Sequence, residues 1–177
     1  MGATRTSLIY NQAIIQEKRM ASRIEYAKLA PGAIRAMVSL ETYIREASDL
    51  EAELVELVKL RASQINACAY CIDMHTKDAR ALGISEQRLY LTSAWREAPF
   101  YSDRERAALA WTEALTLVST AGVGDELFEK AREHFSEKEL VDLTMAVNAI
   151  NSWNRLAIGF RAEVGSYQPA GRNAREG

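Results

Sequence analysis

This chain contains no segment in which apolar and polar residues alternate with the period of two that a half-buried β-strand requires. Helix starts are marked instead by three pairs of serine and glutamate, each with the three-residue spacing of a capping box. The pairs are Ser48 with Glu51, Ser102 with Glu105, and Ser136 with Glu139. These signals predict an all-α fold.

Further signals divide the chain into a bundle of six to eight helices. Pro31 suits the first turn of a helix that runs to about Ala47. Gly83 would close a second helix, over about residues 68–82, and Ser85 would cap a short one to about Trp95. Asp125 opens another short helix, and a long one is expected over about residues 137–164. We expect one domain over residues 1–177, with residues 1–20 unassigned and residues 171–177 a disordered tail.

Composition narrows the class of protein. With 177 residues and 48% hydrophobic residues, the chain can bury a full core. Its 22 basic and 24 acidic residues are well mixed, which argues against a nucleic-acid partner. No apolar run approaches the roughly 20 residues of a membrane span, and the N-terminus lacks the apolar core of a signal peptide. No glycine-rich phosphate loop is present, so no nucleotide or flavin cofactor is expected. We expect a cytoplasmic protein.

Cys68 and Cys71 are the only cysteines, and His75 follows them by one helical turn. Residues three and four apart are neighbours on a helix, so Cys68 lies beside Cys71 and Cys71 beside His75. Two thiols at that spacing can form a disulfide. A thiol reacts as its thiolate, and a neighbouring imidazole can take the proton. The pair therefore predicts thiol chemistry.

The sequence supports other roles for the two cysteines to different degrees. Haem attachment requires histidine directly after the second cysteine, where this chain has Ile72. Structural zinc usually takes four ligands, but only His134, about sixty residues on, could join Cys68, Cys71 and His75. A redox dithiol is favoured, no metal is expected, and buried structural cysteines remain the simplest alternative.

Helical periodicity places the other candidate residues. Cys68, Cys71 and His75 share an apolar face and should point into the core. In the preceding helix Glu56 falls away from the apolar stripe, as a solvated carboxylate would, whereas Arg61 falls inside it. Arg61 should therefore either extend its charge to solvent or pair with a buried acid. Asn151 and Asn154 share an apolar stripe, so they should be buried and hydrogen-bonded, either between helices or subunits or along a substrate channel.

The spacing Glu56-x11-Cys68-x2-Cys71-x3-His75, within the segment Leu57–Asn66, resembles the core motif of the alkyl hydroperoxidase D-like branch of the carboxymuconolactone decarboxylase family. The segment Asn151–Leu156 also resembles that branch, and the similarity spans about residues 25–165. The resemblance implies an all-α fold and a homo-oligomer, with a hexamer favoured and the site near subunit contacts. In such an oligomer a neighbouring subunit could cover Glu56, which would explain why Glu56 lies away from the apolar stripe of its own helix.

The resemblance also implies roles for four residues. Glu56 would hold or polarise His75, His75 would deprotonate Cys71, and Cys71 would attack a hydroperoxide to give a sulfenic acid. Cys68 would then form the disulfide. This chain has Tyr70 where the best-known members have a histidine between the two cysteines. A phenol is a poor base at neutral pH, so the relay would be shorter or slower here.

From motif and resemblance together we expect a thiol-dependent peroxidase in antioxidant defence. It would reduce a small hydroperoxide through a Cys68–Cys71 cycle, with an unidentified dithiol as reductant. One alternative is a thiol–disulfide oxidoreductase, or a redox-sensing protein, that uses the same cysteines without peroxide. A structural helical oligomer whose cysteines no longer react is another. Carboxymuconolactone decarboxylase activity is disfavoured, because true decarboxylases generally lack the cysteine pair.

Overall fold

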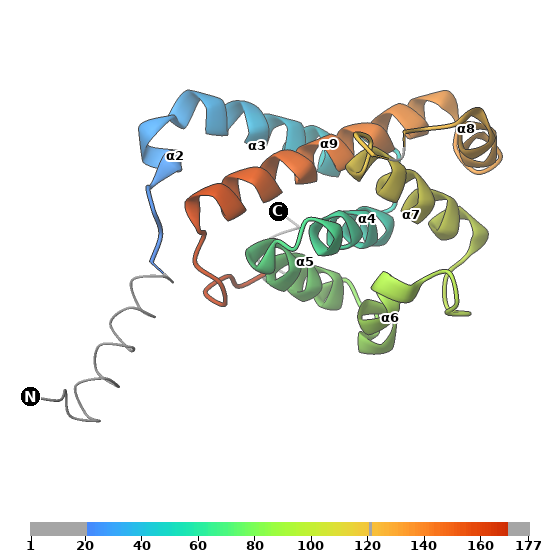
Figure 1. Cartoon of the computed structure of the whole chain (residues 1–177), viewed down its shortest axis with the longest axis horizontal. Helices are drawn as coiled ribbons and strands as arrows, with labels where there is room; N and C mark the ends of the chain where they lie inside the picture. Colours follow the sequence, from blue (N-terminus) through green and yellow to red (C-terminus); the bar gives the residue numbers. More distant parts are fainter. Residues whose placement is uncertain (1–20, 121, 170–177) are drawn as a thin grey trace, which may run out of the picture.

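The computed structural model describes residues 21–120 and 122–169, and within them it contains eight α-helices, one 3₁₀ helix and no strand (Figure 1). The α-helices are α2 (Tyr26–Leu29), α3 (Pro31–Glu46), α4 (Ala52–Ile65), α5 (Ala69–Ala81), α6 (Glu86–Leu91), α7 (Asp103–Thr116), α8 (Asp125–Arg132) and α9 (Glu137–Phe160). The 3₁₀ helix η1 (Thr92–Ala94) follows α6. The predicted all-α fold is confirmed. The predictions for residues 1–20 and 171–177 lie outside the described residues.

Two of the three predicted capping boxes are formed. The side chains of Ser102 and Ser136 each accept a hydrogen bond from the backbone N–H of the glutamate three residues on, and that glutamate bonds back. The prediction for Ser48 is wrong. Its hydroxyl donates to the carbonyl of Ile44 at the end of α3, so Ser48 terminates one helix instead of starting the next. Helix α4 begins at Ala52, after an extended Glu51.

Most other boundaries match the expectation, with one clear shift. Gly83 has a φ of 99° and follows α5, as predicted, and Ser85 caps α6. Helix α9 ends at Phe160, four residues before the expected end. Arg161 adopts a left-handed conformation with a φ of 56°, which turns the chain sharply. The residues after it are therefore free to run back across the bundle.

Helix α4 lies at the centre of the molecule and is buried on nearly all sides (Figure 1). It packs against α5, α7 and α9, while α3 lies along α9. Its buried side chains include Leu54, Leu57, Val58, Leu60, Ala62 and Ser63. A central helix has no single solvent face. A single apolar stripe therefore does not identify which of its residues are buried.

The buried apolar residues form separate clusters around α4. One cluster joins α4, α7, α8 and α9; a second joins α4, α5, α6 and α7; and a third surrounds the two cysteines between α4, α5 and the end of α9. Arg61 adds a polar link to α7, because its Nε donates to Oε1 of Glu113 at 2.7 Å. Of the two alternatives for Arg61, pairing with a buried acid is the one observed.

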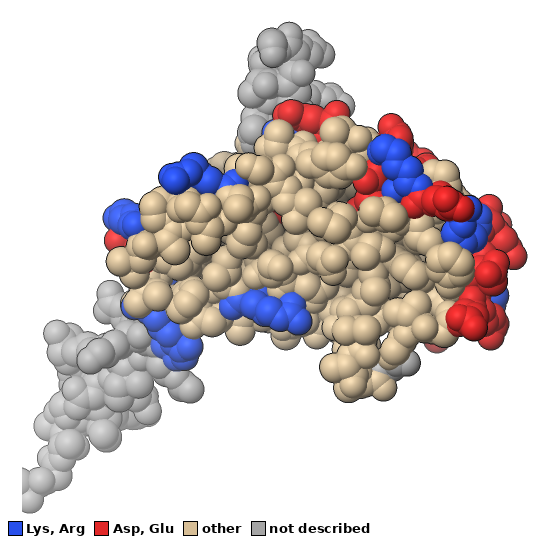
Figure 2. Space-filling model, turned by 90° about the horizontal axis from the view of Figure 1, so that it is seen from above, with Lys and Arg blue, Asp and Glu red and all other residues tan. Residues whose placement is uncertain are grey.

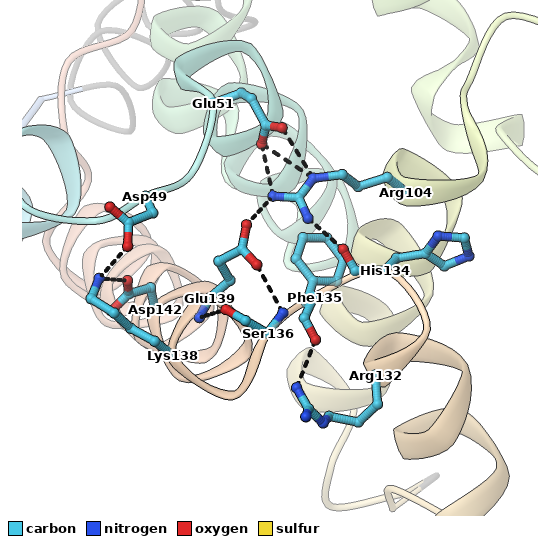
Figure 3. A network of polar contacts seen from close by, with 10 residues as sticks. All are labelled: Asp49, Glu51, Arg104, Arg132, His134, Phe135, Ser136, Lys138, Glu139 and Asp142. Atoms are coloured by element: carbon cyan, nitrogen blue, oxygen red, sulfur yellow. Dashed lines mark hydrogen bonds and ion pairs between the residues drawn. The ribbon is translucent and has the colours of Figure 1, made fainter.

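Arg104 on α7 joins the starts of α4 and α9 at one end of the bundle (Figure 3). Its guanidinium bonds to Glu51 at 3.0 Å, to Glu139 at 2.7 Å and to the backbone carbonyl of His134, and it lies over the ring of Phe135. An arginine fork with several partners can hold three elements in register.

Among the described helices, none is both long and apolar enough to span a membrane.

Candidate dithiol site

The turn between α4 and α5 places the two cysteines. Ala67 has a φ of 55°, a left-handed conformation that is uncommon for a residue with a Cβ. The preceding Asn66 holds this turn, because its Nδ2 donates to Oδ1 of Asn151 at 2.9 Å and to Oδ1 of Asn154 at 2.8 Å. Cys68 follows as the N-cap of α5. Helix α9 therefore fixes where α5 begins.

Asn151 and Asn154 are buried and hydrogen-bonded, as the sequence predicted. The Nδ2 of Asn154 donates to Oγ of Ser63 on α4 at 3.1 Å, and the Nδ2 of Asn151 donates to Oγ1 of Thr116 on α7 at 3.1 Å. Because these bonds cross between helices of one chain, the two side chains connect helices within the bundle. They support the turn that carries the cysteines.

Cys68 and Cys71 are joined by a disulfide, with their Cα atoms 5.4 Å apart. Each residue is only 1% exposed. The Sγ of Cys68 accepts the backbone N–H of Cys71 at 3.4 Å, at the N-terminus of α5. The partial positive charge of a helix N-terminus favours a thiolate there once the disulfide is reduced. Both thiols thus have a feature that supports ionisation: the helix end for Cys68 and the nearby His75 for Cys71.

Glu56 and His75 form a hydrogen-bonded pair across α4 and α5. Oε2 of Glu56 lies 2.8 Å from Nδ1 of His75, and the side chains are 17% and 5% exposed. The interpretation of Glu56 as a solvated carboxylate is wrong, because α5 packs over the face of α4 that carries it. Contacts within one chain cover Glu56, so no neighbouring subunit is needed for that purpose.

The second imidazole nitrogen of His75, Nε2, is buried and has no hydrogen-bond partner among the described residues. A carboxylate on Nδ1 fixes the tautomer that has its proton on Nδ1, which leaves Nε2 as the proton acceptor. A buried polar atom without a partner calls for a reason. Acceptance of a thiol proton from Cys71, one turn away on α5, would supply one.

Asp78 and Tyr167 belong to the same cluster, although sequence reasoning did not single them out. The carboxylate of Asp78 and the ligand atoms of Glu56 and His75 all lie within 4.8 Å of one another. The hydroxyl of Tyr167 donates to Oδ1 and Oδ2 of Asp78 at 2.7 Å and 2.9 Å. The three-residue spacing of His75 and Asp78 could have indicated Asp78. No sequence signal pointed to Tyr167.

Glu56, His75 and Asp78 bring one imidazole and two carboxylates together, a set of groups that can serve as metal ligands. Three of their groups already make hydrogen bonds to protein partners: the Glu56 carboxylate and Nδ1 of His75 bond to each other, and the Asp78 carboxylate accepts from Tyr167. We therefore interpret the three residues as a hydrogen-bonded network.

A second polar contact borders the cysteines on the side of α3. Lys59 on α4 is 6% exposed and pairs with Glu41 on α3. Oε1 of Glu41 also accepts the indole N–H of Trp153 at 3.0 Å. Trp153 and the half-buried Tyr70 pack against the cysteine pair. The periodicity of α4 alone gave no reason to expect a buried lysine.

Comparison with known proteins places the chain in a family. A profile of the carboxymuconolactone decarboxylase family matches residues 31–114. The uncharacterized protein YdfG of Bacillus subtilis is 46% identical over 139 residues, which are 78% of this chain and 94% of YdfG.

Solved structures agree with this assignment. A protein of unknown function from Agrobacterium tumefaciens, named as a candidate antioxidant defence protein AhpD, is 47% identical and superposes with a TM-score of 0.77 over 85% of this chain and 99% of its own. The debrominase Bmp8, at 20% identity, shares the fold with a TM-score of 0.71 over 78% of this chain and 74% of its own. The chain belongs to the carboxymuconolactone decarboxylase family, in its alkyl hydroperoxidase D-like branch.

Proposed function

We propose that this protein is a thiol-dependent peroxidase that reduces hydroperoxides through a Cys68–Cys71 dithiol cycle. One observation carries the proposal. A disulfide-forming pair sits at the N-terminus of α5, one turn before a buried His75 whose Nδ1 bonds to Glu56 and whose Nε2 has no partner among the described residues. This arrangement couples a redox-active pair to a proton acceptor.

The catalytic cycle begins with the reduced pair. Nε2 of His75 takes the proton of the Cys71 thiol, and Glu56 stabilises the imidazolium through Nδ1–H. The Cys71 thiolate attacks the terminal, hydrogen-bearing oxygen of the hydroperoxide, and the O–O bond breaks. An alcohol leaves with the proton from His75, and Cys71 becomes a sulfenic acid. The Cys68 thiol then attacks the sulfenic sulfur, releasing water and forming the disulfide.

An external dithiol closes the cycle by thiol–disulfide exchange, which returns both cysteines to thiols and oxidises the dithiol to its own disulfide. Reduction of this kind is favoured in the cytoplasm, and we place the protein there. Because each cysteine is only 1% exposed, the peroxide must be small, or the surrounding side chains must move to admit it.

A homo-oligomer is part of the proposal, with a hexamer favoured by family resemblance. Figure 2 shows a face on which charged side chains lie mainly near the edges and uncharged residues fill the middle. Exposed apolar side chains among the described residues include Leu29 of α2, Val38 of α3, and Val141 and Ile158 of α9. Contiguous exposed apolar surface is typical of subunit contacts.

Thiol counting tests the function. The fully reduced protein should lose both thiols on addition of one equivalent of an organic hydroperoxide, and a supplied dithiol should then sustain peroxide consumption. Oxidation by disulfides without peroxide consumption would instead favour a thiol–disulfide oxidoreductase or redox sensor that uses the same pair. Thiols that react with neither oxidant would leave the cysteines structural.

A further inference from the structure

The chain that follows α9 packs against the candidate site. After the left-handed turn at Arg161, it runs back beside α5 (Figure 1). Nζ of Lys77 holds this segment by donating to the backbone carbonyl of Tyr167 at 3.0 Å and lies 3.4 Å from that of Gly165. The hydroxyl of Tyr167 reaches both oxygens of Asp78. Residues 88 to 90 positions apart in the sequence therefore meet beside His75.

The charges around His75 are arranged in a definite way. Glu56 faces the imidazole from α4, Asp78 and the disulfide-bonded Cys71 come from α5, and Tyr167 comes from the C-terminal segment. The two carboxylates lie within 4.8 Å of each other and of the imidazole. Each has its own donor, because Glu56 bonds to Nδ1 of His75 and Asp78 accepts from Tyr167.

We propose that Asp78 and Tyr167 are positioning residues of the site: Asp78 supplies a second negative charge that stabilises the imidazolium of His75, and Tyr167 holds that carboxylate in place. The proposal rests on the proposed function, in which His75 accepts the proton of Cys71. The step is a proton transfer from the Cys71 thiol to Nε2 of His75. It produces a thiolate and an imidazolium, and no oxidant or reductant takes part.

The chemistry of the Tyr167 hydroxyl suits this role. Burial, followed by the hydrogen bond to Asp78, raises the pKa of Tyr167 above its ordinary value. The hydroxyl consequently keeps its proton at neutral pH and remains a donor. A donor that keeps its proton holds the Asp78 carboxylate in place beside the imidazole.

The two histidines of the chain make a direct test possible. The imidazole proton resonances of His75 and His134 can be followed by NMR against pH in the wild type, Asp78→Asn, Tyr167→Phe and the double variant. His134 serves as an internal reference. Tyr43→Phe is the matched control, because it removes another tyrosine–aspartate hydrogen bond, of 2.8 Å to Asp142, between α3 and α9.

Removal of the Asp78 charge should lower the titration midpoint of His75 by about one pH unit, since a nearby opposite charge favours the charged form by that order. The thiolate–imidazolium pair should become about tenfold less populated relative to the neutral pair, as measured by thiolate ultraviolet absorbance in a reduced Cys68→Ser background. Tyr167→Phe should produce a smaller shift in the same direction. The double variant should match Asp78→Asn, because Tyr167 acts through Asp78.

An unchanged His75 midpoint in Asp78→Asn, or in Tyr167→Phe, would overturn the proposal. Additive shifts in the double variant would also overturn it, because Tyr167 would then act independently of Asp78. If Asp78→Asn does not fold, the single Tyr167→Phe variant decides the matter. None of these readouts uses peroxide. A protein that shows the shifts but consumes no peroxide would refute the peroxidase function, while the effect of Asp78 and Tyr167 on the proton transfer from Cys71 to His75 would still hold.

Discussion

Replacement of Glu56 by glutamine tests the proton relay most directly. The amide keeps the size of the side chain and can still accept the Nδ1–H bond of His75, but it lacks the negative charge. Because Glu56 Oε2 lies 2.8 Å from Nδ1 and both side chains are largely buried, that charge acts on the imidazolium with little screening by water. We expect a slower reaction of Cys71 and little change in the fold.

The size of the effect follows from Coulomb's law. Two unit charges about 4 Å apart interact by about 4 kcal/mol at an effective dielectric constant of about 20. That value is an upper limit, because the amide oxygen still bonds to Nδ1–H and the Asp78 charge remains. Since about 1.4 kcal/mol corresponds to a factor of ten, the rate of Cys71 oxidation should fall by roughly 10-fold to 10³-fold.

The assay is single-turnover oxidation of the reduced protein by an organic hydroperoxide, quenched at intervals and followed by thiol counting. Glu53→Gln is the matched control, because Glu53 lies on the same helix, one turn earlier, and is exposed. Sedimentation of each variant shows whether assembly has changed. A Glu56→Gln rate equal to that of the control, with unchanged assembly, would refute the relay and reduce the His75 contact to a structural one.

Four further predictions concern the cysteines, a possible metal and stability. Cys71→Ser should abolish peroxide reduction, whereas Cys68→Ser should permit one oxidation and block turnover; equal initial oxidation rates in the two variants would contradict this assignment. Elemental analysis of the purified protein should find no stoichiometric zinc, and one zinc per chain would disprove this expectation. Glu41→Gln should lower the free energy of unfolding by about 3 kcal/mol, measured by chemical denaturation, because it leaves the buried Lys59 ammonium without an opposite charge; a loss below about 1 kcal/mol would show that water reaches Lys59. A hydrogen bond from the Ser136 backbone, and then Arg104, lower the pKa of Glu139 to about 2, so the stability it contributes should be complete above about pH 5 and lost as pH falls toward 2. Glu139→Gln should flatten that acid dependence in denaturation curves, and an unchanged slope would count against it.

Local sequence signals predicted much of the helical framework. Ser102 and Ser136 start helices because a side-chain oxygen and a glutamate three residues on satisfy backbone groups within one turn, and that chemistry needs no distant partner. Ser48 carries the same pattern, yet its hydroxyl bonds back to the end of α3. The Ser48 hydroxyl can either accept a backbone N–H of the following helix or donate to a carbonyl of the preceding one, and the packing of α3 and α4 selects between these two bonds.

The cysteine pair and its histidine were also visible in the sequence, because all three lie within two turns of one helix. Family resemblance, rather than periodicity, indicated Glu56. A helical wheel assumes one buried face and one solvent face, whereas α4 is surrounded by α5, α7 and α9. Its apparent outer face consequently carries a half-buried Glu56 and a buried Lys59, both paired with residues of other helices.

Tertiary structure alone placed Tyr167 beside the site. The sequence determined the spacing of Cys68, Cys71 and His75, since helix geometry converts positions three and four apart into neighbours. It did not determine contacts between residues far apart in the chain, because those depend on where α9 ends and how the chain turns at Arg161. That turn brings Tyr167 to Asp78, 89 positions earlier in the chain. Contacts of this kind arise from the packing of whole helices, which no local pattern encodes.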